Sequence, residues 1–413
     1  MEVREANALG TSTVTTSRPI VNTHVHLPPN FSAFTSVDDA VRSAVAEGIA
    51  VLGASNFHDQ RIYARFREVA HAAGIVPLYG IEFITADAEL AAQGIRVNDP
   101  GNPGRIYVCG KGIDPFATPS GASQAIFART RAADVERMCA MVTLLRSAFG
   151  GAGLETPLTD QSIAEDVADR AGVPRDWVVL QERHAAQAFQ EALFLTTAPE
   201  RRAATLAAAF GGPSPVNVDD QVAVQAEIRS RLMKAGRPAF VPESTVSFAD
   251  AYGLILELGG IPSYPTLADG AVPVCPWEDS PAGLAAQILE RGFHAAELIP
   301  TRNRPEVVDA YVAAFRSAGI VVTAGTEHNT AVRVPLEPRC VDGTLPSETA
   351  RDAFWEGTCV IAAHQHLRSE GRLGFVDAHG VPNGAFPDAD ARIRWFAALG
   401  AELIAARTAV AAR

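Results

Sequence analysis

The sequence lacks the cysteine pattern of a disulfide framework and any long uninterrupted apolar run. Its cysteines are odd in number and none are spaced as C-x-x-C, which is typical of reduced thiols in a cytoplasmic protein and argues against a zinc knuckle. No stretch approaches the ~20 apolar residues of a membrane-spanning helix. The N-terminal segment 1–19 contains acidic residues and no apolar core, so we expect no secretory signal. The cysteines are Cys109, Cys139, Cys275, Cys340 and Cys359.

The sequence also has fewer basic than acidic residues. The chain has 35 Lys and Arg against 47 Asp and Glu, a formal net charge of −12, and we find no basic run. Surfaces that bind long nucleic acids are normally basic, so we expect neither DNA nor RNA as a partner. A small anionic substrate stays compatible with this charge if a metal ion and a few local cations neutralise it. No coiled-coil pattern indicates an oligomeric state.

What the sequence does contain is enough apolar material for a large core. It has 413 residues, of which 47% are hydrophobic and 20% charged. Such a composition is globular and fits one large α/β domain with an insertion, or two to three smaller domains.

Strand and helix patterns alternate in the first part of the chain. Residues 19–26, 49–54 and 75–85 predict strands, and 36–48 and 60–73 predict helices, which is the rhythm of a parallel sheet or barrel. Long helical patterns then replace this rhythm until about residue 238. The alternation of strands and helices resumes at Thr245. The segment 347–367 predicts a helix followed by a strand-like run that ends on His364 and His366. We therefore predict the first part of a barrel in 1–115, a helical insertion in 116–238, and the rest of the barrel with a C-terminal extension in 239–413.

Histidines and carboxylates follow the predicted strands. His24 and His26 are two residues apart in a strand, so both imidazoles face the same side and can reach one ion. Glu82 lies on the third strand. Taken singly, each of these residues is commonly structural or solvated. Their clustering at strand ends, where β/α barrels assemble active sites, favours a metal centre. Histidine and glutamate suit zinc, manganese and iron alike, so the metal is not identified. Further candidates after other strands are His58, Asp59, Glu327 and His328.

Four short motifs carry a family resemblance. They are N-T-H-V-H (22–26), A-S-N-F-H-D (54–59), Y-G-I-E (79–82) and G-T-E-H-N (325–329). Together they resemble the motifs of the PHP family (polymerase and histidinol phosphatase) of metal-dependent phosphoesterases, over about residues 18–115 and 240–330. The resemblance implies a distorted β/α (TIM-like) barrel of the PHP type with up to three metals, in which His58 is a ligand and Glu82 a bridge.

Some family positions differ in this chain. Tyr107 stands where the family has one histidine, Tyr264 or Thr266 where it has another, and Asn329 where it has a third. The remaining residues are enough for one complete site with a firmly bound metal ion. Whether a second or third ion also binds stays undecided at this point. The ligands of the first ion would be His24, His26, Glu82 and Glu327; further ions could use His58 and His328.

The predicted substrate-binding residues come from other segments. Glu182-Arg183-His184 is similar to an Arg- and His-containing run in one branch of small phosphoesterases, which implies that Arg183 or His184 binds a phosphate. An exposed helical pair is the alternative. Arg302 follows another predicted strand and is an anion-binding candidate, and Tyr264 and His366 could reach the same site.

These observations support three hypotheses. The first is a phosphoesterase for a small phosphorylated metabolite or nucleotide, in which the metal activates water and His58 or Asp59 moves protons. The second is a single-metal hydrolase or lyase for a carbonyl or carbohydrate substrate. The third is a catalytically decayed binding protein, although the joint presence of the histidines and Glu82 argues against decay.

Overall fold

The computed structural model describes residues 18–243 and 245–411, so most of segment 1–19, for which no secretory signal is expected, lies outside the described residues. Among the helices described, none has both the length and the apolar composition needed to cross a membrane. The strands are β1 (Ile20–Val25), β2 (Ile49–Phe57), β3 (Val76–Ala86), β4 (Arg105–Lys111), β5 (Val246–Ser247), β6 (Ile261–Thr266), β7 (Ala295–Leu298) and β8 (Val321–Ala324).

The sheet curves into a nearly closed, distorted barrel. Its strand order is β1-β2-β3-β4-β6-β7-β8, and the short β5 pairs with the end of β3. The last residues of β1 meet the chain just after β8, where the amide of Glu327 donates to His24 O (2.8 Å) and the amide of His26 donates to Glu327 O (2.7 Å). Gly325 permits this approach, because a Cβ at that position would lie 2.3 Å from the Cβ of His24. The predicted TIM-like barrel is confirmed.

One strand runs against the others. β4 is antiparallel to both β3 and β6, whereas the remaining neighbours in the barrel wall are parallel. Its first residues therefore lie at the carboxyl end of β3, where Tyr107 pairs with Ile84. Its last residue, Lys111, pairs with Gly80 and lies deeper in the barrel.

Amphipathic helices cover the barrel wall. In α1, Ser36 caps the first turn by accepting from the amide of Asp39, and the buried positions Val37, Ala40, Val41 and Ala44 follow the helical period. Strands are buried on both faces, which explains their continuous apolar runs. The helices are α1 (Val37–Ala46), α2 (Tyr63–Ala72), α3 (Ala88–Ala92), α4 (Gly121–Gly151), α5 (Asp160–Ala171), α6 (Glu182–Thr196), α7 (Pro199–Phe210), α8 (Gln221–Ile228), α9 (Phe248–Glu257), α10 (Pro281–Glu290), α11 (Pro305–Ser317), α12 (Glu348–Ser369) and α13 (Ala389–Ala411).

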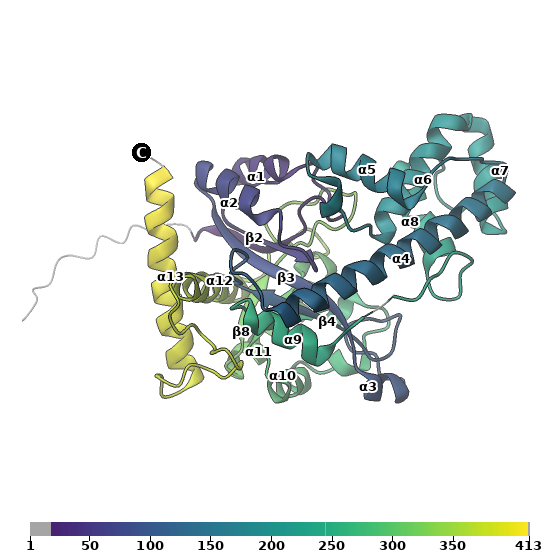
Figure 1. The fold of residues 1–413 in the computed structure, drawn as a ribbon. Coiled ribbons are helices and arrows are strands. Elements are labelled where there is room, and N and C mark those ends of the chain that lie inside the picture. The colour runs from purple at the N-terminus through teal and green to yellow at the C-terminus, as the bar shows by residue number, and fades with distance from the viewer. Residues whose placement is uncertain (1–17, 244, 412–413) are drawn as a thin grey trace, which may run out of the picture.

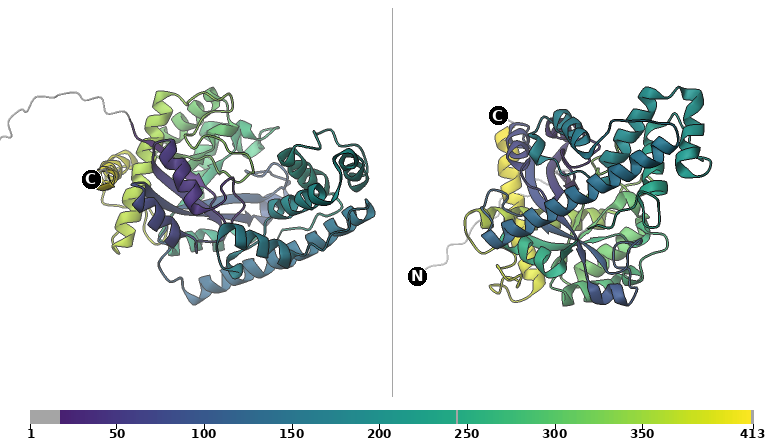
Figure 2. Two further views of the ribbon diagram at one scale, coloured as in Figure 1. Left: turned by 90° about the horizontal axis from the view of Figure 1, so that it is seen from above. Right: turned by 45° about the vertical axis from the view of Figure 1, so that its right-hand side comes forward.

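Helices α4–α8 project beyond one end of the barrel, as Figures 1 and 2 show. They have a hydrophobic cluster of their own, separate from that of the barrel and centred on side chains such as Phe149, Phe189 and Leu206. The predicted domain boundaries at 116 and 238 stay a prediction, but the helical content of this segment is as expected. The carboxyl ends of β1, β2 and β3 face these helices (Figure 1).

The opposite end of the barrel is covered by α12 and α13, which corrects one prediction. The segment 347–367 does not end in a strand, because α12 continues as one helix to Ser369. Its buried face packs with the first halves of the strands in a third hydrophobic cluster that includes Val51, Val76 and Val321. His364 and His366 are therefore helical residues at the end of the barrel remote from the insertion.

Candidate metal centre and the cavity above it

Three predicted ligands converge at the carboxyl ends of β1 and β3. His24 Nε2 lies 3.3 Å from His26 Nε2 and 3.7 Å from Glu82 Oε2, and His26 Nε2 lies 3.2 Å from Glu82 Oε2. Ligand atoms about 2.1 Å from one tetrahedral ion are separated by about 3.4 Å. The triangle therefore has the size that a divalent ion requires.

The polar atoms of this trio are poorly satisfied without a cation. All three residues are buried, and Glu82 Oε2 and His26 Nδ1 have no hydrogen-bond partner among the described residues. A buried carboxylate oxygen without a donor is costly, whereas a metal ion placed between the three atoms would neutralise it. The donor set of two imidazoles and one carboxylate fits zinc, manganese or iron.

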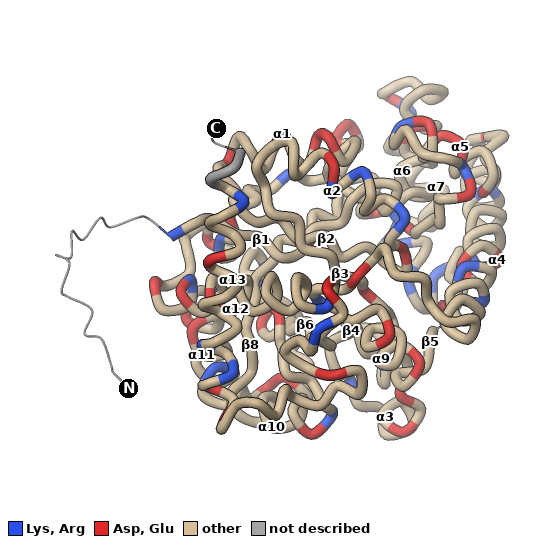
Figure 3. Tube along the Cα trace, turned by 60° about the vertical axis from the view of Figure 1, so that its left-hand side comes forward, with Lys and Arg blue, Asp and Glu red and all other residues tan. Residues whose placement is uncertain are grey.

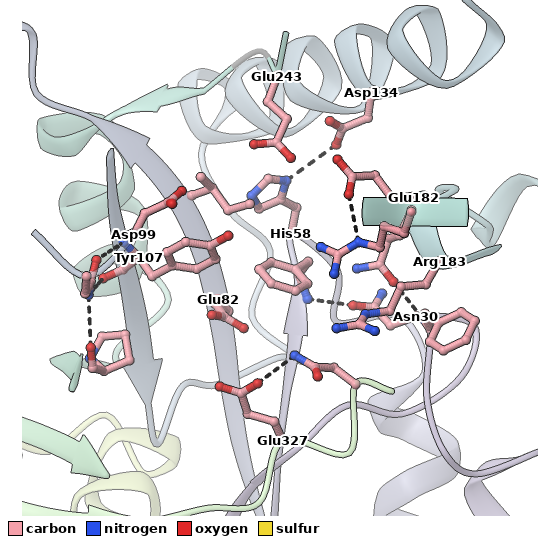
Figure 4. Close-up of a pocket in the computed structure, with 18 of the residues that line it drawn as sticks. Asn30, His58, Glu82, Asp99, Tyr107, Asp134, Glu182, Arg183, Glu243 and Glu327 are labelled. Atoms are coloured by element: carbon pink, nitrogen blue, oxygen red, sulfur yellow. Dashed lines mark hydrogen bonds and ion pairs between the residues drawn. The ribbon is translucent and has the colours of Figure 1, made fainter. Parts of the chain in front are cut away.

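Above the trio lies a cavity of about 400 Å³ between the barrel and the insertion. Figure 4 shows Glu82 and Glu327 at its base, Tyr107 and Asp99 on one side, and Arg183 on the other. The insertion contributes Asp134 and Arg137 from α4, Glu182 and Arg183 from α6, and Arg229.

His58 lines this cavity but is not one of the three converging ligands. Its backbone is left-handed, with φ of +49°, a conformation uncommon for residues other than glycine. The ring stacks on Phe83, and its Nδ1 lies 3.6 Å from a carboxylate oxygen of Asp134 on α4. Its Nε2 is buried without a partner in the described chain. Asp134 of the insertion thus lies beside Nδ1 of His58, while Nε2 of the same ring has no partner among the described residues.

Glu327 and Arg302 lie together at the cavity. The carboxylate of Glu327 accepts from the guanidinium of Arg302 and from the side-chain Nδ2 of Asn329. It does not belong to the group formed by His24, His26 and Glu82, whose ligand atoms lie within 4.8 Å of one another. Burial opposes its ionisation, but Arg302, His24 and His26 together hold the pKa of Glu327 below its usual value. Its assignment as a fourth ligand stays a prediction.

Arg183 faces the cavity with no ion-pair partner among the described residues. Burial, together with Arg229 and Arg302, lowers the pKa of its guanidinium to about 10, against the opposing effect of Glu327 and Glu182. His184, by contrast, does not line the cavity. Its Nδ1 accepts from the amide of Gln181 (3.0 Å) at the start of α6, and burial and Arg170 lower its pKa to about 3. The imidazole therefore caps the helix.

Two predicted residues near the site are engaged elsewhere. Asp59 does not line the cavity, because its carboxylate binds the guanidinium of Arg61, which also donates to backbone carbonyls of the insertion. His328 has no free ring nitrogen, since Nδ1 contacts Thr326 Oγ1 (2.7 Å) and Nε2 contacts Val334 O (3.0 Å). The predicted roles of Asp59 in proton transfer and of His328 in metal binding stay predictions, and in this structure both side chains are engaged in other contacts.

The structure places two other predicted substrate-binding residues away from the cavity. Tyr264 is buried behind the barrel wall, where its hydroxyl donates to Glu278 Oε1 (2.7 Å). His366 lies on α12 beside Glu370, at the end of the barrel opposite to the carboxyl ends of the strands. Neighbouring His364 is buried and bonds Gly259 O and the amide of Phe375, a structural role.

Sequence reasoning missed several residues of this region. Asp134 and Arg229 have no local signal, because they lie on helical segments of the insertion. Lys111 and Glu297 are buried inside the barrel; Lys111 is the last residue of β4, and Glu297 is the third of the four residues of β7. A charged residue in an apolar strand is the signal by which they could have been found.

Comparisons with known proteins add information on the fold. No family model and no curated protein matches the sequence. Among solved structures, a provisionally named metal-dependent phosphoesterase from Bifidobacterium adolescentis is similar, with 16% identity and a TM-score of 0.50, covering 82% of this chain and 96% of that one. An amidohydrolase from Chromobacterium violaceum, solved with sulfate and no metal, has 15% identity and a TM-score of 0.49, covering 78% and 94%. At 16% identity the likeness to the first of these structures extends to the fold alone, and membership of the PHP family stays a prediction from the motifs.

Proposed function

We propose that this chain is a metal-dependent hydrolase that cleaves phosphate esters of a small anionic molecule. The observation that carries the proposal is the buried convergence of His24 Nε2, His26 Nε2 and Glu82 Oε2 at the base of a cavity. A divalent ion bound there would supply Lewis-acid stabilisation of the phosphoryl oxygens and a lowered pKa for water. The name of the neighbour from Bifidobacterium adolescentis agrees with this reaction class.

Among the described residues, six carboxylates and four arginines line the cavity, and three of the arginines pair with carboxylates, so the positive charge for an anionic substrate would come from a bound metal ion and from Arg183. Arg183, Arg229 and Arg302 all line the cavity, and Arg183 is free to form a bidentate contact with a phosphate. Elsewhere on the chain, acidic and basic positions are interspersed in the view of Figure 3, in agreement with a small substrate and not a long nucleic acid. Cytoplasmic location stays an expectation from the cysteines.

His58 is the residue best placed to move a proton. Its side chain lines the cavity and its Nε2 is buried without a partner among the described residues, while Asp134 lies beside Nδ1 and can orient the ring. An imidazole held in this way can take a proton from water or give one to the leaving group at Nε2.

The direct test combines metal analysis with a substrate panel. We expect purified protein to contain about one ion of zinc, manganese or iron per chain, and to hydrolyse phosphate monoesters of small molecules after reconstitution. Amides, lactones and glycosides serve as the comparison panel. Turnover of these compounds without turnover of any phosphate ester would contradict the phosphoesterase assignment, and absence of bound metal would contradict the hydrolase.

Replacing Arg183 with methionine is expected to lower kcat/KM for a phosphate ester by about 10- to 100-fold. A charge-assisted hydrogen bond contributes about 1.5–3 kcal/mol, and 1.36 kcal/mol corresponds to a factor of ten. Steady-state kinetics would measure the effect. Arg170→Met is the matched control, because Arg170 lies on the insertion but pairs with Glu191 away from the cavity. Equal losses in both variants would argue against substrate binding by Arg183.

Replacing His58 with glutamine is expected to lower kcat by about 10²- to 10⁴-fold, the usual contribution of general acid–base catalysis. Because His58 is not in the trio, the metal content should stay at the wild-type value. Single-turnover kinetics and elemental analysis of the same preparation would test both statements. Loss of the ion along with activity would instead make His58 a ligand.

A further inference from the structure

A buried ion pair lies beneath the metal centre, inside the barrel. Lys111 Nζ lies 2.6 Å from Glu297 Oε1 and 3.3 Å from both Ser55 Oγ and the carbonyl of Thr23. Both partners are almost completely inaccessible to solvent, at 3% and 0% side-chain exposure. Neither residue lines the cavity above the centre, so this pair does not contact substrate.

The pair reaches the metal centre through His24. The second carboxylate oxygen of Glu297 lies 2.6 Å from His24 Nδ1, and Thr23 Oγ1 donates to the first at 3.0 Å. A carboxylate already paired with an ammonium group has no proton to give, so Nδ1 must be the donor in this contact. In the neutral imidazole, the form that binds a metal ion, the other nitrogen then carries the lone pair, and it is this Nε2 that lies beside His26 and Glu82.

The same ammonium group restricts the number of ions. His24, Cys109 and Glu297 also have donor atoms within 4.8 Å of one another and form a second candidate ligand group. Lys111 Nζ already lies 2.6 Å from Glu297 and 3.5 Å from His24 Nδ1. A dication among these atoms would face a positive charge at close range, so Lys111 takes the place of a second ion.

We propose that the Lys111–Glu297 pair positions His24 as a metal ligand, by accepting its Nδ1–H and so presenting Nε2 to a single ion. This inference rests on the proposed metal centre. The two residues are positioning residues, not catalytic ones. Carboxylates that bond metal-ligating histidines in this way typically change metal affinity by 10- to 100-fold when removed.

The experiment compares two double variants that both lack the buried charges. Lys111→Met/Glu297→Gln keeps an oxygen acceptor for His24 Nδ1, whereas Lys111→Met/Glu297→Leu has none. Replacing both partners avoids an unpaired buried charge, and such replacements are often neutral for stability. The zinc dissociation constant of each apoprotein would be measured by competition with a chelator, and the fold checked by circular dichroism.

We expect the glutamine variant to bind zinc within about threefold of the wild type and the leucine variant 10- to 100-fold more weakly. Equal affinities in all three proteins would overturn the positioning role and leave the metal centre intact. No zinc binding by the wild type would overturn the metal centre itself, and the inference with it. If a variant does not fold, ¹⁵N NMR spectra of the histidine side chains in the zinc-bound wild type test the same proposal. We expect Nδ1 of His24 to be protonated, and a deprotonated Nδ1 would overturn the proposal.

Discussion

Replacing Glu82 with alanine is expected to remove the bound ion and to lower kcat/KM by about a thousand-fold. The carboxylate is one of three ligands, and its Oε2 is the only anionic atom of the trio. Lewis-acid stabilisation of a phosphoryl transition state contributes several kcal/mol, and about 4 kcal/mol corresponds to a factor of about 10³. Elemental analysis would measure the metal, and initial rates on the phosphate ester identified by the panel would measure the activity.

The stability of the metal-free protein provides an independent test of the same variant. Since the carboxylate is buried without a hydrogen-bond donor to Oε2, its removal should not lower the melting temperature of the apoprotein. The wild type should gain stability on adding zinc, and the variant should not. Glu68→Ala is the control, because Glu68 is an exposed carboxylate of α2. A variant that keeps its ion and its rate would contradict the assignment of Glu82 as a ligand.

The ligand trio could be predicted because its signals are local. His24 and His26 are two residues apart in a strand, and Glu82 lies opposite Phe57 on a neighbouring strand, in a parallel register. Strand periodicity and the parallel arrangement of β1, β2 and β3 then suffice to bring the side chains to one end of the barrel. No long-range information is needed beyond the expectation that consecutive strands are adjacent.

The C-terminal histidines show where a local signal fails. The apolar run before His364 fits a buried strand and a buried helix equally well, because both faces are covered and no periodicity remains. Tertiary packing decides the outcome: Gly357 lets α12 lie directly against the backbone of β8, where a Cβ would meet Val322 O at 2.0 Å. The helix therefore continues through His366, and the predicted strand end does not form.

Other features depend on contacts between segments far apart in the sequence. The reversed direction of β4 follows from its pairing with β3 and β6 and brings Lys111 into the barrel interior. The approach of Asp134 to His58 depends on how the insertion docks on the barrel. Arg61 pairs locally with Asp59, but its further contacts with the carbonyls of Asp176 and Trp177 depend on the same docking. A single sequence contains no pattern that fixes such pairings.

Within the insertion, the buried carboxylate of Glu182 joins several segments. Glu182 accepts from Arg137 (2.6 Å) on α4, from Arg229 (2.8 Å) after α8, and from Lys234 (2.7 Å). These contacts join α6 to its neighbours and hold Arg137 and Arg229 at the wall of the cavity. Replacement of Glu182 with glutamine would leave three cations around a neutral group, and removal of one partner from a buried ion pair typically costs 3–5 kcal/mol.

We therefore expect Glu182→Gln to lower the free energy of unfolding by about 3 kcal/mol at pH 7, measured by urea denaturation. Burial opposes ionisation of this carboxyl, but Lys234, Arg229 and Arg137 lower its pKa to about 2, below its ordinary value of 4.5. A depressed folded-state pKa stabilises the fold above pH 4.5, and this contribution is lost as the pH falls towards 2. The difference between wild type and variant should accordingly shrink between pH 7 and pH 3. The control is Glu191→Gln, on the same helix but in a largely exposed pair with Arg170, which should lower the free energy of unfolding by at most about 1 kcal/mol. If the difference in unfolding free energy between wild type and Glu182→Gln were the same at all pH values, Glu182 would act by packing alone.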